Sequence, residues 1–271
     1  MNRSSLVRAV SCACLLAAGS ANLFAQHLQS VFIEDLTWTE LRDAIAAGAT
    51  TAIVFSGSVE ESGPHLALGK HNFRARAYAE RIARALTRTL VAPIIPAAPS
   101  PGVLTQFPGT IDIRPEIFAE YNADIVRSLA RSGFTTVLLL GDHGPNQGVL
   151  AALAPRLNSE LGARGTRVWF ISDGYAKSTT EIDALAASRH LVADGHGGLW
   201  DTAELMAVAP QAVRRSRLAR GDSAGTEIMD GRGMSGDPRL ATPALGREFG
   251  DIRVRNAVAQ IRALLTPPRA Q

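Results

Sequence analysis

Residues 57–71 decide the fold and carry the first group of polar side chains. They read Gly57-Ser58-Val59-Glu60-Glu61-Ser62-Gly63-Pro64-His65-Leu66-Ala67-Leu68-Gly69-Lys70-His71. They follow an apolar run at 51–55, Thr-Ala-Ile-Val-Phe, which predicts a buried strand. Polar groups at the carboxyl end of a strand in an α/β sheet face the crevice where ligands bind. The residues expected at such a site are Glu60, Glu61, His65 and His71. Oxygen and imidazole donors of this kind suit zinc, manganese or ferrous iron.

Helices and strands alternate along the rest of the chain. Apolar runs predict further strands at 91–95, 134–140 and 167–171. Periodicity and end signals predict helices at 39–47 (capped by Thr39 and ended at Gly48), 73–89 (with Tyr78, Ile82 and Leu86 on one face), 115–131, 149–161 and 251–265. Parallel strands need crossovers, and right-handed crossovers place helices on both faces of the sheet. We therefore predict an α/β fold, a three-layer α/β/α sandwich with a mostly parallel central sheet.

Residues 1–25 have the layout of a secretory signal peptide. Arg3 and Arg8 precede an apolar stretch at 9–18, and Ala25 marks the expected cleavage point. Cleavage removes two arginines and no acidic residue, which takes the formal net charge from +3 to +1 and leaves no cysteine. That charge argues against nucleic-acid binding. We expect a periplasmic or secreted protein, free of the membrane after cleavage, with a retained N-terminal anchor as the alternative.

The mature chain, 26–271, is predicted to be one domain. Its segment 214–239 is poor in apolar residues and is predicted to be a long functional or subunit-contact loop. Two polar clusters resemble the first in position. Residues 141–148 follow the strand at 134–140 and read Gly-Asp-His-Gly-Pro-Asn-Gln-Gly, and residues 194–204 read Asp-Gly-His-Gly-Gly-Leu-Trp-Asp-Thr-Ala-Glu. We expect the three clusters to meet in one pocket at the carboxyl edge of the sheet.

These clusters resemble the signatures of the creatininase family of metal-dependent amidohydrolases. Gly57-Ser58-x-Glu60 with Gly63-Pro64-His65-Leu66 resembles the first signature, and Gly141-Asp142-His143-Gly144-x-Asn146 resembles the third. Residues 107–111 are similar to the second signature, 196–202 to the family's His-Ala-Gly with Glu-Thr-Ser, and 233–246 to its C-terminal block. The resemblance implies an α/β/α sandwich, often assembled into hexamers. It also implies hydrolysis of a non-peptide or cyclic amide C–N bond in a small molecule by a metal-bound water.

The resemblance implies a set of metal ligands. Glu60 and His143 keep the family's primary ligands, whereas His71 stands in the place of an aspartate that bridges two metals. Ser62 replaces a histidine that binds the second metal. A histidine nitrogen binds one ion where a carboxylate can bind two, and a neutral hydroxyl is a poor ligand. We therefore predict one divalent ion per chain, held by Glu60, His71 and His143, with zinc favoured and manganese or iron as alternatives.

His196 matches the family's candidate acid/base and is predicted to protonate the leaving nitrogen or relay a proton. Asp201 is one methylene shorter than the family's glutamate and is predicted to orient His196. Three residues are predicted beside the ligands. Asp142 either orients His143 or is itself a ligand, His65 makes a structural hydrogen bond, and Glu61 has no assigned chemistry.

Two other functions fit the same residues. Because Ser62 and His71 depart from a two-metal pattern, one alternative is a non-catalytic family member that acts as a binding or scaffold protein, with His71 as a loop histidine beside the site. The other is a hydrolase of an ester, lactone or formamide that uses the same hydroxide.

Overall fold

The structure is a computed structural model that describes residues 29–192, 196–220 and 233–266. The expected signal peptide, residues 1–25, lies outside the described residues, as do Asp194, Gly195 and residues 221–232 of the expected long loop. Within that loop, Met234 and Ser235 are buried. The described part of the segment 214–239 is therefore partly packed into the protein.

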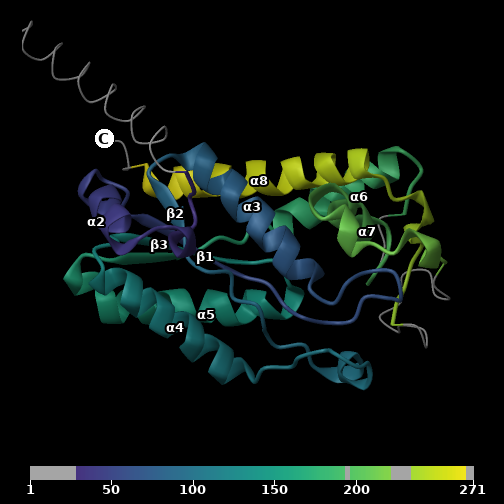
Figure 1. The fold of residues 1–271 in the computed structure, drawn as a ribbon, viewed down its shortest axis with the longest axis horizontal. Coiled ribbons are helices and arrows are strands. Elements are labelled where there is room, and N and C mark those ends of the chain that lie inside the picture. The colour runs from purple at the N-terminus through teal and green to yellow at the C-terminus, as the bar shows by residue number, and fades with distance from the viewer. Residues whose placement is uncertain (1–28, 193–195, 221–232, 267–271) are drawn as a thin grey trace, which may run out of the picture.

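Four parallel strands form the central sheet, in the order β2-β1-β3-β4 (Figure 1). The strands are β1 (Thr51–Ser56), β2 (Thr89–Val91), β3 (Thr136–Gly141) and β4 (Arg167–Phe170). Strands β1 and β3 pair along their full length, from Thr51 opposite Thr136 to Ser56 opposite Gly141. Both strands end at the same edge, so the polar segments that follow them start side by side.

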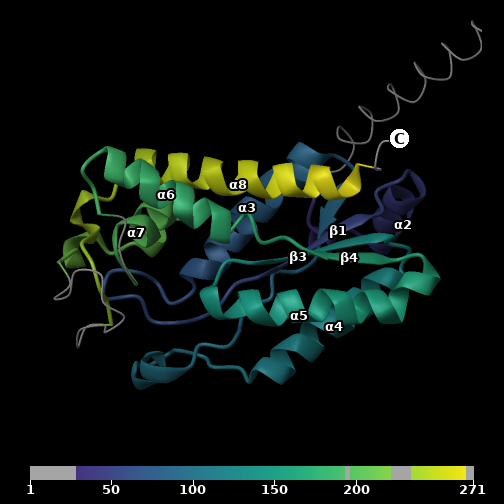
Figure 2. The same ribbon diagram turned by 180° about the vertical axis from the view of Figure 1, so that it is seen from behind.

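Helices cover both faces of this sheet (Figures 1 and 2). On one face lie α4 (Pro115–Arg131) and α5 (Gly144–Leu161), and on the other lie α3 (Lys70–Leu86) and α8 (Pro243–Leu265). Helices α6 (Ala176–Ser188) and α7 (Leu199–Val208) pack against α8, and α2 (Trp38–Ala46) precedes β1. Short 3-10 helices lie at Ile33–Asp35, Gly102–Gln106, Gly162–Arg164, Pro210–Ala212, Arg215–Arg217 and Pro238–Leu240. The predicted three-layer α/β/α sandwich is confirmed.

Side chains of β1 and β3 alternate between two hydrophobic cores. Those facing α4 and α5 are Ala52, Val54, Val137 and Leu139. Those facing α3 and α8 are Ile53, Phe55, Leu138 and Leu140. Because both faces are covered, each strand is apolar throughout, which is why the sequence predicted these two strands well.

Helix 115–131 is confirmed at both ends, but other predicted boundaries are wrong. The N-cap of α2 is Thr37, not Thr39, because the Thr37 hydroxyl accepts from the Glu40 amide while the Glu40 carboxylate accepts from the Thr37 amide. Strand β2 ends at Val91, where 91–95 was predicted. Helix α3 runs over 70–86 instead of 73–89. The apolar pattern did not reveal its first turn, because the buried side chains there are polar and form ion pairs.

Four helices of the C-terminal half escaped prediction in whole or part. Helix α5 begins at Gly144, five residues before the predicted start, because its glycine-rich first turns read as a loop. Helix α8 begins at Pro243 and not at 251, with Thr242 as its N-cap. Helices α6 and α7 were not predicted at all.

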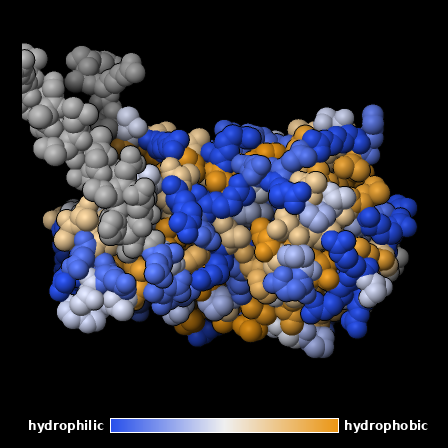
Figure 3. Space-filling model, turned by 45° about the horizontal axis from the view of Figure 1, so that its top comes forward, coloured by the Kyte–Doolittle hydropathy of each residue, from blue (hydrophilic) through white to orange (hydrophobic). Residues whose placement is uncertain are grey.

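Among the described residues, no helix is both long and apolar enough to span a bilayer. Figure 3 shows hydrophilic side chains spread between hydrophobic ones over one face of the molecule.

Candidate active site

Three buried side chains converge where β1 and β3 end. Glu60 follows β1, His143 follows β3, and His71 lies in the first turn of α3. One candidate ligand atom from each residue lies within 4.8 Å of the others. His71 Nε2 is 2.8 Å from Glu60 Oε1, and His143 Nε2 is 2.7 Å from Glu60 Oε2. The structure thus brings together the three residues that the sequence predicted as metal ligands, which we call the triad.

The triad suits a divalent metal ion. Two imidazoles and one carboxylate are a known ligand set for catalytic zinc, which leaves a further position open. A ring nitrogen this close to a carboxylate oxygen needs a proton or a metal ion between the two lone pairs. His71 Nδ1 already faces Asp142 Oδ2 at 2.7 Å, so one ring hydrogen is directed there and Nε2 can present its lone pair. His143 Nδ1 is buried without a hydrogen-bond partner among the described residues. These residues therefore fit a divalent ion.

The electrostatics keep the triad ready to bind a cation. Burial alone would raise the pKa of Glu60, but the charge of Lys70 and the adjoining His71 and His143 side chains outweigh it and hold this pKa well below its usual range. Burial lowers the pKa of His143, and Glu60 offsets this only in part. At neutral pH the triad therefore contains an ionised carboxylate and a neutral His143 imidazole, which are the forms that bind metals.

Asp142 lies against His71 and not against His143. Its Oδ2 accepts from His71 Nδ1 and from Arg74, with distances of 2.9 Å to Nε and 2.7 Å to Nη2. Burial would raise the pKa of Asp142, but Arg74 and His71 lower it, so the carboxylate is charged. The sequence left open whether Asp142 orients His143 or is itself a ligand. The first of these interpretations named the wrong histidine, because Asp142 contacts His71. The contact fits a carboxylate that orients the imidazole of His71, a candidate metal ligand.

The Asp142→Asn variant is expected to bind Zn²⁺ about 10- to 100-fold more weakly, because the amide neither fixes the His71 tautomer nor raises its basicity. Competition with a chromophoric chelator measures this affinity. Asp251→Asn is the control. Asp251 forms an ion pair with Arg81 on the surface, and neither residue belongs to the site. Equal affinities for Asp142→Asn and wild type would show that Asp142 does not act on the metal site.

Lys70 was not predicted as a site residue, yet its ammonium group lies next to the triad. Nζ is 3.2 Å from Glu60 Oε1 and 3.0 Å from Asp201 Oδ2, and it also donates to Ser62 Oγ. Only 1% of the side chain is exposed. Burial would lower the pKa of Lys70, but Asp201 and Glu60 raise it above its usual value, so the group stays charged.

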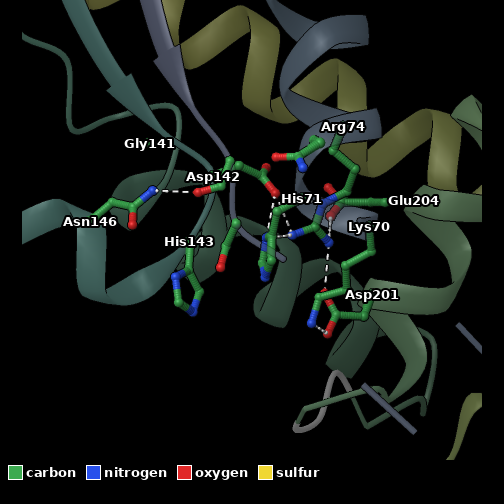
Figure 4. Close-up of polar contacts among 12 residues, drawn as sticks. Lys70, His71, Arg74, Gly141, Asp142, His143, Asn146, Asp201 and Glu204 are labelled. Atoms are coloured by element: carbon green, nitrogen blue, oxygen red, sulfur yellow. Dashed lines mark hydrogen bonds and ion pairs between the residues drawn. The ribbon is translucent and has the colours of Figure 1, made fainter. Parts of the chain in front are cut away.

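A buried network of ion pairs connects Lys70 to helices α7 and α8 (Figure 4). Asp201 Oδ1 accepts from Arg74 Nη1 at 2.7 Å, and Arg74 Nη1 is 3.0 Å from Glu204 Oε2. Glu204 Oε1 accepts from Arg253. Burial would raise the pKa of Asp201, but Lys70 and Arg74 lower it far below its usual value. Asp201 therefore anchors the cations behind the triad.

His196 has a different partner from the one predicted. Its Nε2 lies 2.5 Å from the Glu61 carbonyl oxygen and 3.2 Å from both Glu61 Oε1 and Ser62 Oγ. A carbonyl oxygen can only accept, so Nε2 carries a hydrogen; in the neutral imidazole, Nδ1 then has the lone pair. His196 Nδ1 is 3.9 Å from Glu60 Oε1 and so faces the triad. The prediction that Asp201 orients His196 is not what these contacts show, because Glu61 lies beside the ring.

Two glycines let these loops approach one another. Gly197 has φ +68°, and a Cβ there would lie 2.7 Å from the Ser62 carbonyl oxygen. Gly233 has φ +73°, and a Cβ there would lie 1.7 Å from Glu61 Oε2. Both positions combine a left-handed backbone with a close contact, so only glycine fits. The loop that carries His196 and the C-terminal block are thereby held against residues 61–62.

His65 makes a hydrogen bond with Thr202 at 2.9 Å and is fully buried. Burial lowers the pKa of His65 to about 4, although the nearby Asp201 partly offsets this effect. The hydrogen bond is of the structural kind that the sequence predicted for this residue.

Stability is expected to fall as the pH drops from about 6.5 to about 4, because the unfolded chain takes up a proton on His65 before the folded protein does. The contribution is fully present above the unfolded pKa and decreases by about 3 kcal/mol across this window. Urea unfolding at several pH values should show a smaller pH dependence for His65→Gln than for wild type. The control is His190→Asn at an exposed position, and an unchanged pH dependence in His65→Gln would contradict the prediction.

The sequence missed the buried cations because they lie outside the apolar pattern. Lys70 and Arg74 continue the face of Tyr78 and Ile82 backward along α3 in steps of four residues, and all four are buried. Two positive charges on the buried face of a helix are a signal that could have identified them.

The fold and site define an α/β/α protein with a parallel sheet and a candidate metal centre at the carboxyl edge of that sheet. The model of the creatininase family, described as creatinine amidohydrolase, matches residues 34–261. The chain belongs to the creatininase family.

Known relatives support this placement. The creatinine amidohydrolase of Pseudomonas putida is 27% identical over 199 residues, which cover 70% of this chain and 76% of the relative. The mycofactocin precursor peptide peptidase of Mycobacterium tuberculosis is 27% identical over 233 residues, which cover 78% and 84%. A crystal structure of creatinine amidohydrolase shares the fold with a TM-score of 0.75 at 22% identity, covering 89% of this chain and 100% of that one. Two further creatininase structures are described as containing Mn and as Zn-Zn type.

Proposed function

We propose that this creatininase-family hydrolase cleaves the C–N bond of a small-molecule, non-peptide amide with one divalent ion held by Glu60, His71 and His143. The observation that carries the proposal is the convergence of three candidate ligand atoms within 4.8 Å in a buried place. Zinc is the first choice, because two imidazoles with one carboxylate are a catalytic zinc set, and manganese or iron are the alternatives. Neighbours described as containing Mn and Zn support both leading ions.

When bound to the triad, a divalent ion supplies Lewis acidity and makes hydroxide available near neutral pH. The residues around it position ligands and move protons. Asp142 holds the His71 hydrogen at Nδ1, so that Nε2 faces Glu60. His196 Nδ1 faces the triad with its lone pair, and it is the atom that accepts a proton from water and passes it to the leaving nitrogen. The Glu61 carbonyl oxygen accepts the Nε2 hydrogen of His196, and the Glu61 carboxylate lies beside the ring.

We further propose an exported protein, periplasmic or secreted, that forms a homo-oligomer, with the hexamers of its family as the expected form. The layout of residues 1–25 supports export. The +1 formal charge of the chain after Ala25 supports partners other than nucleic acid, and no membrane contact is proposed after cleavage.

Thermal melting with and without EDTA, followed by added Zn²⁺ or Mn²⁺, tests the metal site. A free ion at 100 times its dissociation constant should stabilise the fold by about 2.7 kcal/mol. Metal analysis should find about one ion per chain.

The activity test is release of amine from a panel of linear and cyclic amides by the reloaded protein. No metal-dependent shift would overturn the enzyme proposal and favour a scaffold.

A second candidate is cleavage of a peptide. The match to mycofactocin precursor peptide peptidase, over 84% of that protein, favours it. A peptide panel assayed beside the amide panel separates the two, as do esters, lactones and formamides for the third possibility. Hydrolysis confined to peptides would replace the small-amide proposal.

A further inference from the structure

We propose that the Lys70 ammonium group occupies the place that a second metal ion would take beside Glu60, so that the chain carries one ion and one built-in cation. The inference rests on the proposed function, since it assumes an ion at the triad. It assigns Lys70 a role in positioning and charge balance.

The surroundings of Lys70 are those of a cation-binding place. Its three hydrogens meet three oxygens, from Glu60 Oε1 at 3.2 Å, Asp201 Oδ2 at 3.0 Å and Ser62 Oγ. Two carboxylates and a hydroxyl would also be oxygen donors to a metal ion. In this structure the ammonium group fills this place.

Glu60 connects the two cation positions. Its Oε1 faces Lys70 and His71, while its Oε2 faces His143 at 2.7 Å. Lys70 and His71 are consecutive residues in the first turn of α3, so the backbone that places one candidate ligand also places the ammonium group. A carboxylate shared between a metal ion and an ammonium group thus takes the role of a carboxylate shared between two ions.

The buried charges support one ion and not two. Across the described residues, the buried ionisable groups are five carboxylates and three cations besides three histidines. The carboxylates are Glu60, Glu61, Asp142, Asp201 and Glu204, and the cations are Lys70, Arg74 and Arg253. With neutral imidazoles, this set sums to −2. One divalent ion brings the sum to zero, whereas two ions would leave +2 in a place with little water to screen it. Uncompensated buried charge is strongly unfavourable, so the set matches a single ion.

The test is the number of Mn²⁺ ions bound by the full chain, measured by titration and by electron paramagnetic resonance. Two manganese ions that share a carboxylate couple magnetically, so the spectrum separates a true pair from an ion bound elsewhere on the surface. Three proteins are compared. Lys70→Ala removes both the charge and the bulk of the side chain, and Lys70→Met removes the charge but keeps the bulk.

The wild type and Lys70→Met are expected to bind one uncoupled ion each, and Lys70→Ala a coupled pair. A coupled pair in the wild type would overturn the inference while leaving the metal site in place. A single ion in a folded Lys70→Ala, checked by circular dichroism, would overturn it too. Should Lys70→Ala not fold, the wild-type count decides: one ion supports the inference, and a coupled pair overturns it. No bound ion in the wild type would overturn the proposed function itself, and the inference with it.

Discussion

The Glu60→Gln variant is expected to bind Zn²⁺ at least about 100-fold more weakly than the wild type and to lose hydrolase activity to the same extent. The expected loss exceeds the 10- to 100-fold typical of residues that only support ligands, because Glu60 contacts both histidines of the triad. Glutamine keeps the shape of the side chain but offers no negative charge, and its amide nitrogen, unlike a carboxylate oxygen, is not a metal ligand. Isothermal titration with Zn²⁺ measures the affinity.

Glu61→Gln is the matched control for Glu60→Gln. Glu61 is the next residue and is also buried, but its carboxylate lies beside His196 and outside the triad. Its zinc affinity should therefore equal that of the wild type within experimental error. Circular dichroism of both variants shows whether the fold is kept. Wild-type zinc affinity in a folded Glu60→Gln protein would show that the ligand assignment is wrong.

Replacing Arg74 by methionine is expected to lower the free energy of unfolding by about 3 to 5 kcal/mol. Arg74 has no exposed surface and donates to three carboxylates, those of Asp142, Asp201 and Glu204. Removing one partner of a buried ion pair leaves uncompensated charge in the interior, and this accounts for the large effect. Urea unfolding of the metal-free proteins gives the difference directly.

Arg84→Met on the same helix is the control for Arg74→Met. Arg84 forms a comparable ion pair with Glu80, four residues earlier, but its side chain is 52% exposed. Exposed pairs contribute little, so this variant should change the stability by less than about 1 kcal/mol. Similar losses in the two variants would mean that the charge network behind the triad contributes no more than a surface pair.

The central strands and the place of the site could be predicted from sequence because each leaves a local pattern. Strands β1 and β3 are apolar along their length, and the polar stretches that carry Glu60 and His143 follow them directly. Parallel strands in register deliver both stretches to one edge, so the place of the site followed from the fold. The choice of Glu60, His71 and His143 as ligands followed from the resemblance to the creatininase family. The ligand role of the triad stays a prediction until metal is measured.

The partners of these residues could not be predicted, because they depend on how helices pack across the sheet. Arg74 meets Glu204 across 130 positions of sequence, and His196 meets Glu61 across 135. Helix α7 carries Asp201 and Glu204, yet it was not predicted as a helix, and so its contacts with α3 were not considered. The same gap explains why Asp201 was paired with His196 and not with Lys70.

The donor set described here has a consequence for how the protein must be produced. Two imidazoles and a carboxylate bind first-row divalent ions in an order of affinity that copper and nickel head, so affinity alone does not select the zinc ion that suits this donor set. The supply of free ions at the moment of folding then decides the occupant. Chains folded in zinc-rich and in manganese-rich medium should emerge with different ions, and protein taken from a nickel column should be stripped before any catalytic assay.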